Sequence, residues 1–214
     1  MELKENIYIL DDVIETDKQL KLVEYFEKNY KSWYCYDKNI AHNNVLDVDG
    51  YKFPAYTKDV KDESEKDILD IIKQIEVNGC EKANLKLLKN YRYKMNAFPP
   101  IEPYPNEEVL HRQIHTDTDN QHIVLLYYVN TAEGDTCLFR NKLGNTKLTN
   151  DLVEGETKVG NFQNIEKIAG ISPKQGRLVI FDGSLLHSPG WPKTGMRYVI
   201  NYNLVIKTES KNLV

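Results

Sequence analysis

The chain has 214 residues, 41% of them hydrophobic, which is enough for one sizeable core or for a core with a helical annex. Lysine and arginine number 28 against 32 acidic residues, and neither sign gathers into a long block, so a nucleic-acid partner is not favoured. No apolar run approaches the length that crosses a bilayer, and the N-terminus has no stretch suited to a signal peptide. We therefore expect no membrane association.

The three cysteines are Cys35, Cys80 and Cys137, and they share no CxxC spacing. An odd number without such spacing argues against a disulfide framework or a thiolate metal site. A reducing compartment fits this pattern best, so a cytoplasmic location is expected.

Two helices are predicted near the N-terminus. Thr16 followed by Gln19 has the form of a capping box, and apolar residues then recur at helical spacing, which predicts a helix over 17–30. An acidic opening and four isoleucines on one face predict a second helix over 62–77. The intervening segment 31–60 has no clear period and is expected to be irregular or to hold short strands.

From Leu85 onward the sequence changes to short β-rich runs separated by Gly, Pro and Asn, a pattern typical of a β-sandwich or barrel. The predicted strands are 88–98, 122–130, 136–140, 177–182 and 197–206. We expect one domain, with 1–84 as a helical buttress and 85–206 as the β core. The polar segments 99–112 and 140–170 are predicted loops and candidates for a lid that selects the substrate.

One pair of polar residues with metal-ligand character, His115 and Asp117, precedes the most apolar predicted strand. Residues two apart in an extended chain share a face, so both side chains can reach one metal ion, while Thr116 points away. His187 follows a predicted turn and supplies a second imidazole. Two imidazoles and one carboxylate can hold one face of a ferrous ion and leave the opposite positions open.

Other interpretations of these histidines remain open. His115 also suits a half-buried position at a strand end, and His187 suits a surface loop. Two histidines and an aspartate fit hydrolytic zinc as well. His111 and His122 compete as ligands, but no HExxH motif is present and the flanking prolines and strand argue against a zinc-protease helix, so both are expected at the rim.

The last predicted strand carries polar residues on one face. These are Arg197, Asn201 and Asn203, together with Val199. Such a face suits a polar pocket inside a barrel, although the solvent side of an edge strand is the alternative. A guanidinium there could bind a carboxylate through two parallel hydrogen bonds. Arg177 is a second candidate anchor, but its place at a strand start favours a structural role.

Together these motifs resemble the 2-oxoglutarate and Fe(II)-dependent oxygenases, particularly the prolyl-4-hydroxylase-like branch with its small bacterial and phage members. The resemblance runs from about Tyr91 to Ile206. It rests on HTD at 115–117, LLYYVN at 125–130, GDTCLF at 134–139, PKQGRLVIFDG at 173–183, His187 and RYVINYN at 197–203. It implies a mostly β fold, a double-stranded β-helix or jelly roll, flanked by two or more α-helices.

The resemblance also implies residue roles. The residues that match the iron ligands are His115, Asp117 and His187. Arg197 matches the residue that binds the distal carboxylate of 2-oxoglutarate, and Tyr128 matches a tyrosine whose hydroxyl assists it. Weaker candidate contacts with this co-substrate are Asn201, Tyr93 and Asn96. Trp191, in the turn after His187, is a candidate wall of the site.

The implied activity is that of a dioxygenase that consumes O2 and 2-oxoglutarate and releases succinate and CO2. It would hydroxylate a C–H bond of a peptidyl-prolyl or small-molecule substrate, with ascorbate as a candidate reductant. Two alternatives stay open: a non-catalytic jelly-roll module that binds a metal or a carboxylate, and a zinc-dependent hydrolase.

Overall fold

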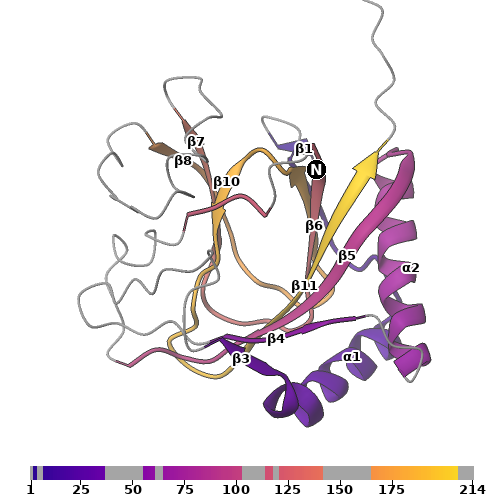
Figure 1. Ribbon diagram of the computed structural model, residues 1–214, viewed down its shortest axis with the longest axis vertical. Coiled ribbons are helices and arrows are strands. Elements are labelled where there is room, and N and C mark those ends of the chain that lie inside the picture. Colours follow the sequence, from indigo (N-terminus) through magenta and orange to yellow (C-terminus); the bar gives the residue numbers. More distant parts are fainter. Residues whose placement is uncertain are drawn as a thin grey trace, which may run out of the picture.

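Two antiparallel β-sheets face each other, and two α-helices cover the outer face of the larger sheet (Figure 1). The computed structural model describes residues 2–3, 7–36, 55–60, 65–102, 114–117, 121–141 and 165–206. His111, most of 99–112 and residues 142–164 of the second predicted loop lie outside these ranges. No helix in the described part of the chain is long and apolar enough to span a membrane.

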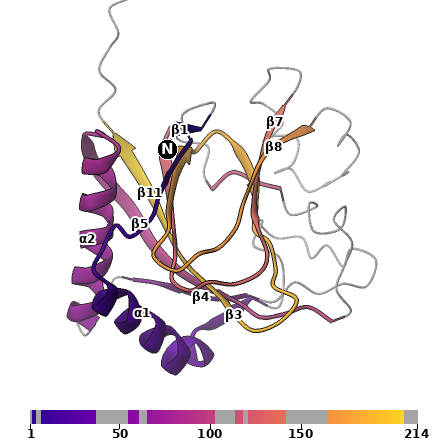
Figure 2. The same ribbon diagram turned by 180° about the vertical axis from the view of Figure 1, so that it is seen from behind.

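The larger sheet has eight strands and the smaller sheet three. In spatial order the larger sheet contains β1 (Glu2–Leu3), β2 (Ile7–Leu10), β9 (Leu178–Asp182), β6 (Ile123–Tyr128), β11 (Arg197–Ile206), β5 (Leu87–Phe98), β4 (Ala55–Asp59) and β3 (Tyr34–Tyr36). The smaller sheet contains β10 (Leu186–Ser188), β7 (Thr136–Asn141) and β8 (Ile165–Ile171). The predicted jelly roll is confirmed. From behind, the smaller sheet lies on the side away from the helices (Figure 2).

The helices are α1 (Thr16–Asn29) and α2 (Lys66–Lys82), with a short 3-10 turn η1 (Tyr30–Ser32) after the first. Both predicted helices are confirmed, although α2 continues beyond its expected end at 77. The predicted capping box is wrong, because Glu15 occupies the N-cap position and makes no side-chain cap hydrogen bond. Gln19 is instead buried and donates to the Ile14 carbonyl oxygen at 3.0 Å.

The N-terminal part is not purely a helical buttress. Strand β2 pairs with β9, and β4 pairs with β5, so both strands extend the larger sheet. The end of the predicted loop 140–170 is also a strand, because β8 pairs with β7. The boundary expected at residue 85 therefore separates strands that belong to one sheet.

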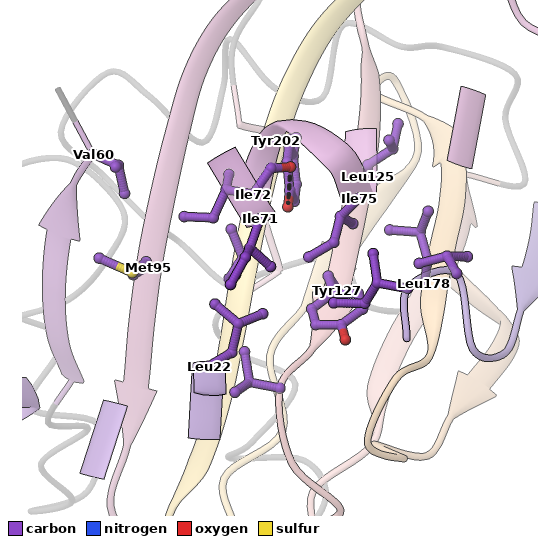
Figure 3. Close-up of a cluster of buried hydrophobic side chains, with 14 of the residues drawn as sticks. Leu22, Val60, Ile71, Ile72, Ile75, Met95, Leu125, Tyr127, Leu178 and Tyr202 are labelled. Carbon is purple, nitrogen blue, oxygen red and sulfur yellow. Dashed lines mark hydrogen bonds between the residues drawn. The ribbon is translucent and has the colours of Figure 1, made fainter. Parts of the chain in front are cut away.

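The core has two layers that meet at the larger sheet. In one layer, α1 and α2 place Leu22, Ile72 and Ile75 against the sheet (Figure 3). In the other, apolar side chains fill the space between the two sheets; they include Val124, Leu126, Val179, Phe181, Leu138 and Trp191. All six residues of β6 are buried, since both of its faces are covered. Alternate residues of the central strands therefore point to the helices and to the interior.

Candidate metal centre and carboxylate pocket

Backbone pairing brings the two predicted histidine ligands together. His115 and His187 form an isolated antiparallel bridge, in which each backbone N–H donates to the other's carbonyl oxygen at 2.9 Å. Their ring centroids lie 4.5 Å apart. The bridge adds His115 to the edge of the smaller sheet beside β10. It thereby brings together two residues that are far apart in the sequence.

Asp117 completes a three-residue cluster with these histidines. The ligand atoms of His115, Asp117 and His187 all lie within 4.8 Å of one another. His115 Nε2 lies 3.9 Å from Asp117 Oδ1, and His187 Nε2 lies 4.0 Å from Asp117 Oδ2. Metal–ligand bonds of roughly 2.0–2.2 Å would bring such donors to about 3 Å apart, so small side-chain movements suffice to load the site.

The surroundings of His187 suit a neutral metal ligand. Its Nδ1 lies 3.3 Å from the Leu185 carbonyl oxygen, which can only accept, so Nδ1 carries the proton and Nε2 keeps its lone pair. Burial is the main cause that lowers the pKa of His187 to about 4; nearby His115 acts in the same direction, and the carboxylate of Asp117 opposes both. The imidazole is therefore neutral near pH 7.

Asp117 is ionised because its neighbours lower its pKa more than burial raises it. Burial alone would raise the pKa of this carboxyl group, but the imidazoles of His187 and His115 and two hydrogen bonds bring the pKa below its usual value. The hydrogen bonds come from the side-chain amides of Asn201 and Asn203, at 3.0 and 2.8 Å. Two imidazoles and one carboxylate form a donor set suited to a divalent first-row metal such as Fe(II).

Arg197 forms a second feature on the same inner face of β11. Its side chain is 1% exposed, and Nη2 donates to Thr136 Oγ1 at 2.7 Å. The Tyr128 hydroxyl also donates to Thr136 Oγ1 at 2.7 Å. The guanidinium carbon lies 5.1 Å from the Phe98 ring centroid and 5.5 Å from that of Tyr128. Aromatic walls and one hydroxyl thus hold the cation.

Among the residues that the structure describes, the guanidinium of Arg197 has no anionic partner. Within the described residues it forms no ion pair, and its Nε and Nη1 atoms are buried without a hydrogen-bond partner. Burial lowers the pKa of Arg197, yet a guanidinium stays protonated near neutrality. An uncompensated buried cation is costly, so the side chains around Arg197, called the Arg197 pocket below, suit a ligand that carries a carboxylate.

The other predicted co-substrate contacts divide between the two faces of the sheet. Asn201 lies at the site, where its amide donates to Asp117. Asn96 is buried and pairs with inward-facing Val199 in the register of β5 and β11. The predicted co-substrate contact of Tyr93 is wrong. Tyr93 belongs to the cluster on the helix side of the sheet and packs edge-on against Tyr202, with 5.4 Å between the ring centroids. The sheet therefore separates Tyr93 from the metal centre.

Three further residues that the sequence analysis considered for the site lie outside the metal cluster. Trp191 is fully buried and packs edge-on against Phe98, 5.4 Å away, so it backs the wall of the Arg197 pocket. His122 is buried beside Gly183 and does not join the metal cluster. Arg177 binds Asp11 through Nε at 2.8 Å, which agrees with its expected structural role.

Two residues at the site were given no role from the sequence. Asn203 was placed on the polar face of the last strand with Arg197, but its hydrogen bond to Asp117 was not predicted. Thr136 carried no signal beyond its place in the GDTCLF motif, because a threonine in a strand is ordinary. Its role follows only from the distance to Arg197 Nη2.

Scans against protein-family models and curated protein sequences found no match. Solved structures do match. A prolyl hydroxylase from Trichoplax adhaerens, in complex with a hypoxia inducible factor peptide fragment, is 16% identical over 94% of this chain and 84% of its own, with a TM-score of 0.55. A collagen prolyl hydroxylase of Paramecium Bursaria Chlorella virus-1, in a 2OG complex, is 11% identical over 95% and 98%, with a TM-score of 0.51.

A third match is the non-heme alpha ketoglutarate dependent epimerase SnoN from nogalamycin biosynthesis. It is 8% identical over 94% of this chain and 79% of its own, with a TM-score of 0.57. At these identities the likeness establishes the fold. The chain has the double-stranded β-helix fold of the 2OG-Fe(II) oxygenases, as expected from the sequence.

Proposed function

We propose that the protein is an Fe(II)- and 2-oxoglutarate-dependent oxygenase. One observation carries this proposal: the His115, Asp117 and His187 cluster and the unpaired cation of Arg197 lie on the same interior, linked along the inner face of β11. A metal cluster alone would suit a hydrolase equally well. A buried guanidinium beside it supports a co-substrate with a carboxylate at its far end.

The chain's own residues would have three tasks. The triad would hold the metal through two imidazoles and one carboxylate, and Arg197 would orient the distal carboxylate of 2-oxoglutarate. Thr136 Oγ1 keeps the guanidinium in place because it accepts a hydrogen bond from Arg197 Nη2. The Tyr128 hydroxyl donates to the same oxygen. Burial raises the pKa of Tyr128, so its hydroxyl remains a hydrogen-bond donor at neutral pH.

The bound iron would supply the redox chemistry by which one O2 oxidises 2-oxoglutarate to succinate and CO2 and inserts one oxygen atom into a substrate C–H bond. The aromatic wall of Phe98, Tyr128 and Trp191 excludes water from the co-substrate end. We propose a peptidyl-prolyl or small-molecule substrate, and the peptide in the Trichoplax adhaerens complex supports the first class. The matches also include an alpha ketoglutarate dependent epimerase, so this fold serves reactions other than prolyl hydroxylation.

Succinate formation tests the proposal before any substrate is known. The protein would be incubated with Fe(II), 2-oxoglutarate, ascorbate and O2, and succinate measured by mass spectrometry. We expect slow turnover that stops without Fe(II), and a loss of roughly 100-fold or more for Asp117→Ala, which removes a metal ligand. Metal binding without succinate would indicate a binding module, and hydrolysis with zinc alone would indicate a hydrolase; either result overturns the proposal.

Arg197→Gln tests the co-substrate pocket separately. The variant removes a charge-assisted hydrogen bond worth about 1.5–3 kcal/mol, so the 2-oxoglutarate concentration for half-maximal turnover should rise about 10- to 150-fold. Arg177→Gln is the matched control, because its guanidinium binds Asp11 away from the pocket. Equal effects of the two substitutions would contradict the assignment. Candidate peptides and metabolites can then be screened for a gain of about 16 Da.

A further inference from the structure

The two oxygen atoms of Asp117 have different surroundings. Oδ2 accepts hydrogen bonds from Asn201 Nδ2 at 3.0 Å and from Asn203 Nδ2 at 2.8 Å, which uses both of its lone pairs. Oδ1 accepts none within the described part of the chain. Its neighbours are His115 Nε2 at 3.9 Å and Arg92 at 4.0 Å. The hydrogen bonds therefore leave Oδ1 as the oxygen with lone pairs to give.

A second layer fixes the orientation of Asn203. Arg92 Nη2 donates to Asn203 Oδ1 at 3.0 Å, while Asn203 Nδ2 donates to Asp117. A guanidinium can only donate and a carboxylate can only accept, so the amide of Asn203 can satisfy both neighbours in one orientation only. Arg92 and Asn203 are direct partners in the β5–β11 register. The sheet itself therefore builds this chain of hydrogen bonds.

We propose that Arg92, Asn203 and Asn201 are positioning residues that hold Asp117 as a single-oxygen metal ligand through Oδ1. Three protein donors leave the remaining positions of a six-coordinate ion open, and a second oxygen from Asp117 would take one of them. The hydrogen bonds to Oδ2 oppose that second contact. This inference rests on the proposed function only in requiring that the triad binds a divalent metal.

Metal binding tests the inference without turnover. Mn(II) would be titrated into the protein and the free ion followed by EPR. Asn203→Leu keeps the side-chain size but cannot donate, and we expect it to weaken Mn(II) binding by 10- to 100-fold, the range typical for residues that orient a ligand. Arg92→Leu should weaken binding less, by about 3- to 10-fold, because it acts through Asn203. Arg92→Lys, which keeps a donor, should restore most of the loss.

Asn78→Leu is the matched control. Asn78 lies on α2, across the larger sheet, where its amide donates to the Val13 carbonyl oxygen, so its loss should leave Mn(II) affinity unchanged. A second readout separates positioning from general stability. The rise in unfolding temperature caused by saturating Mn(II) should shrink in Asn203→Leu, whereas a purely structural residue would lower the metal-free midpoint and keep that rise.

The outcomes separate the inference from the proposed function. If the parent protein binds no Mn(II), both fail. If the parent binds Mn(II) and the Asn203 and Arg92 variants bind it within twofold of the parent, only the positioning role is overturned. If Asn203→Leu does not fold, the Arg92 pair decides, because that side chain is 35% exposed and its replacement leaves the core intact.

Discussion

At the scale of single residues, Thr136 shows how a neutral side chain can support a buried cation. Its Oγ1 accepts from both Arg197 Nη2 and the Tyr128 hydroxyl. Thr136→Val keeps the shape but leaves both donors without this partner, so we expect a loss of about 1–3 kcal/mol in unfolding free energy and weaker 2-oxoglutarate binding. Urea unfolding and a 2-oxoglutarate titration would measure the two effects.

Thr57→Val is the control for that substitution. Thr57 is also a buried threonine, in strand β4 of the larger sheet, but its hydroxyl makes no hydrogen bond among the described residues. Its replacement should change neither stability nor co-substrate binding by a measurable amount. A similar loss in both variants would show that Thr136 contributes only as a strand residue.

Two buried tyrosines give a second residue-scale prediction. The Tyr202 hydroxyl donates to the Ile72 carbonyl oxygen at 3.1 Å, whereas the buried Tyr127 hydroxyl has no hydrogen-bond partner among the residues described (Figure 3). Tyr202→Phe should therefore cost about 1 kcal/mol, while Tyr127→Phe should be neutral or slightly stabilising, because it removes an unsatisfied polar group. Urea unfolding of the two variants provides the comparison. A larger loss for Tyr127→Phe would contradict it.

The sequence predicted the site residues whose chemistry is distinctive. Each of His115, Asp117, His187 and Arg197 has an ordinary alternative role on its own, and they stood out because their combined order resembles the oxygenase pattern. Tyr93 was misplaced, and strand geometry explains why: residues 93 and 96 are three apart in one strand, so they point to opposite faces. Only one of the two could reach the interior.

At the scale of elements, a close crossing of two loops holds the Arg197 pocket together. A Cβ atom on Gly190 would collide with the backbone of Gly134 and Asp135, and backbone cannot move aside cheaply. These segments precede Trp191 and Thr136, which form the pocket. The absence of a side chain at Gly190 therefore sets the distance between the end of β10 and the start of β7.

Gly190→Ala should destabilise the protein by about 3 kcal/mol or more, since overpacking against backbone is at the costly end of its range. Gly195→Ala is the control: it has a φ of +68° but nothing within 4 Å of the added Cβ. It should cost only the backbone strain of about 1–2 kcal/mol. Thermal unfolding would show the difference, and equal losses would argue against the crossing as the cause.

Elements with a clear local apolar pattern were predicted from the sequence, and elements without one were not. The helices and the strands β5, β6, β9 and β11 have clear apolar periods. Strands β2 and β4 are short and gain their stability from neighbours distant in sequence, so they carry little local signal. Strand β8 is mostly exposed or half-buried at the edge of the smaller sheet, and its lack of alternation placed it within the predicted loop.

At the scale of the whole molecule, one ion-pair cluster joins the N-terminal segment to the β core. Asp11, just after β2, binds Arg177 at 2.8 Å and Lys174 at 2.7 Å, both before β9. The hydrogen bond from Arg177 is the main cause that lowers the pKa of Asp11 to about 2. A lowered folded-state pKa stabilises the protein above pH 4, and this contribution is lost as the pH falls towards 2.

Asp11→Asn should therefore lower the unfolding free energy at pH 7 by about 1 kcal/mol at most, because the pair is partly exposed and screened by water. The difference between parent and variant should shrink between pH 4 and pH 2, and also at high salt. Urea unfolding at several pH values would measure it. A difference that stays constant with pH would rule out the ion pair as its source.

The two-layered core has a consequence for how this protein can change. On β11 the odd-numbered positions face the reactive interior and the even-numbered ones face the helices, for example Val199 against Ile200. Substitutions at odd positions of β11 should therefore act on the metal centre and on the surroundings of Arg197, whereas substitutions at even positions should act on the packing against the helices. The same separation gives natural variation a route to new chemistry on an unchanged scaffold.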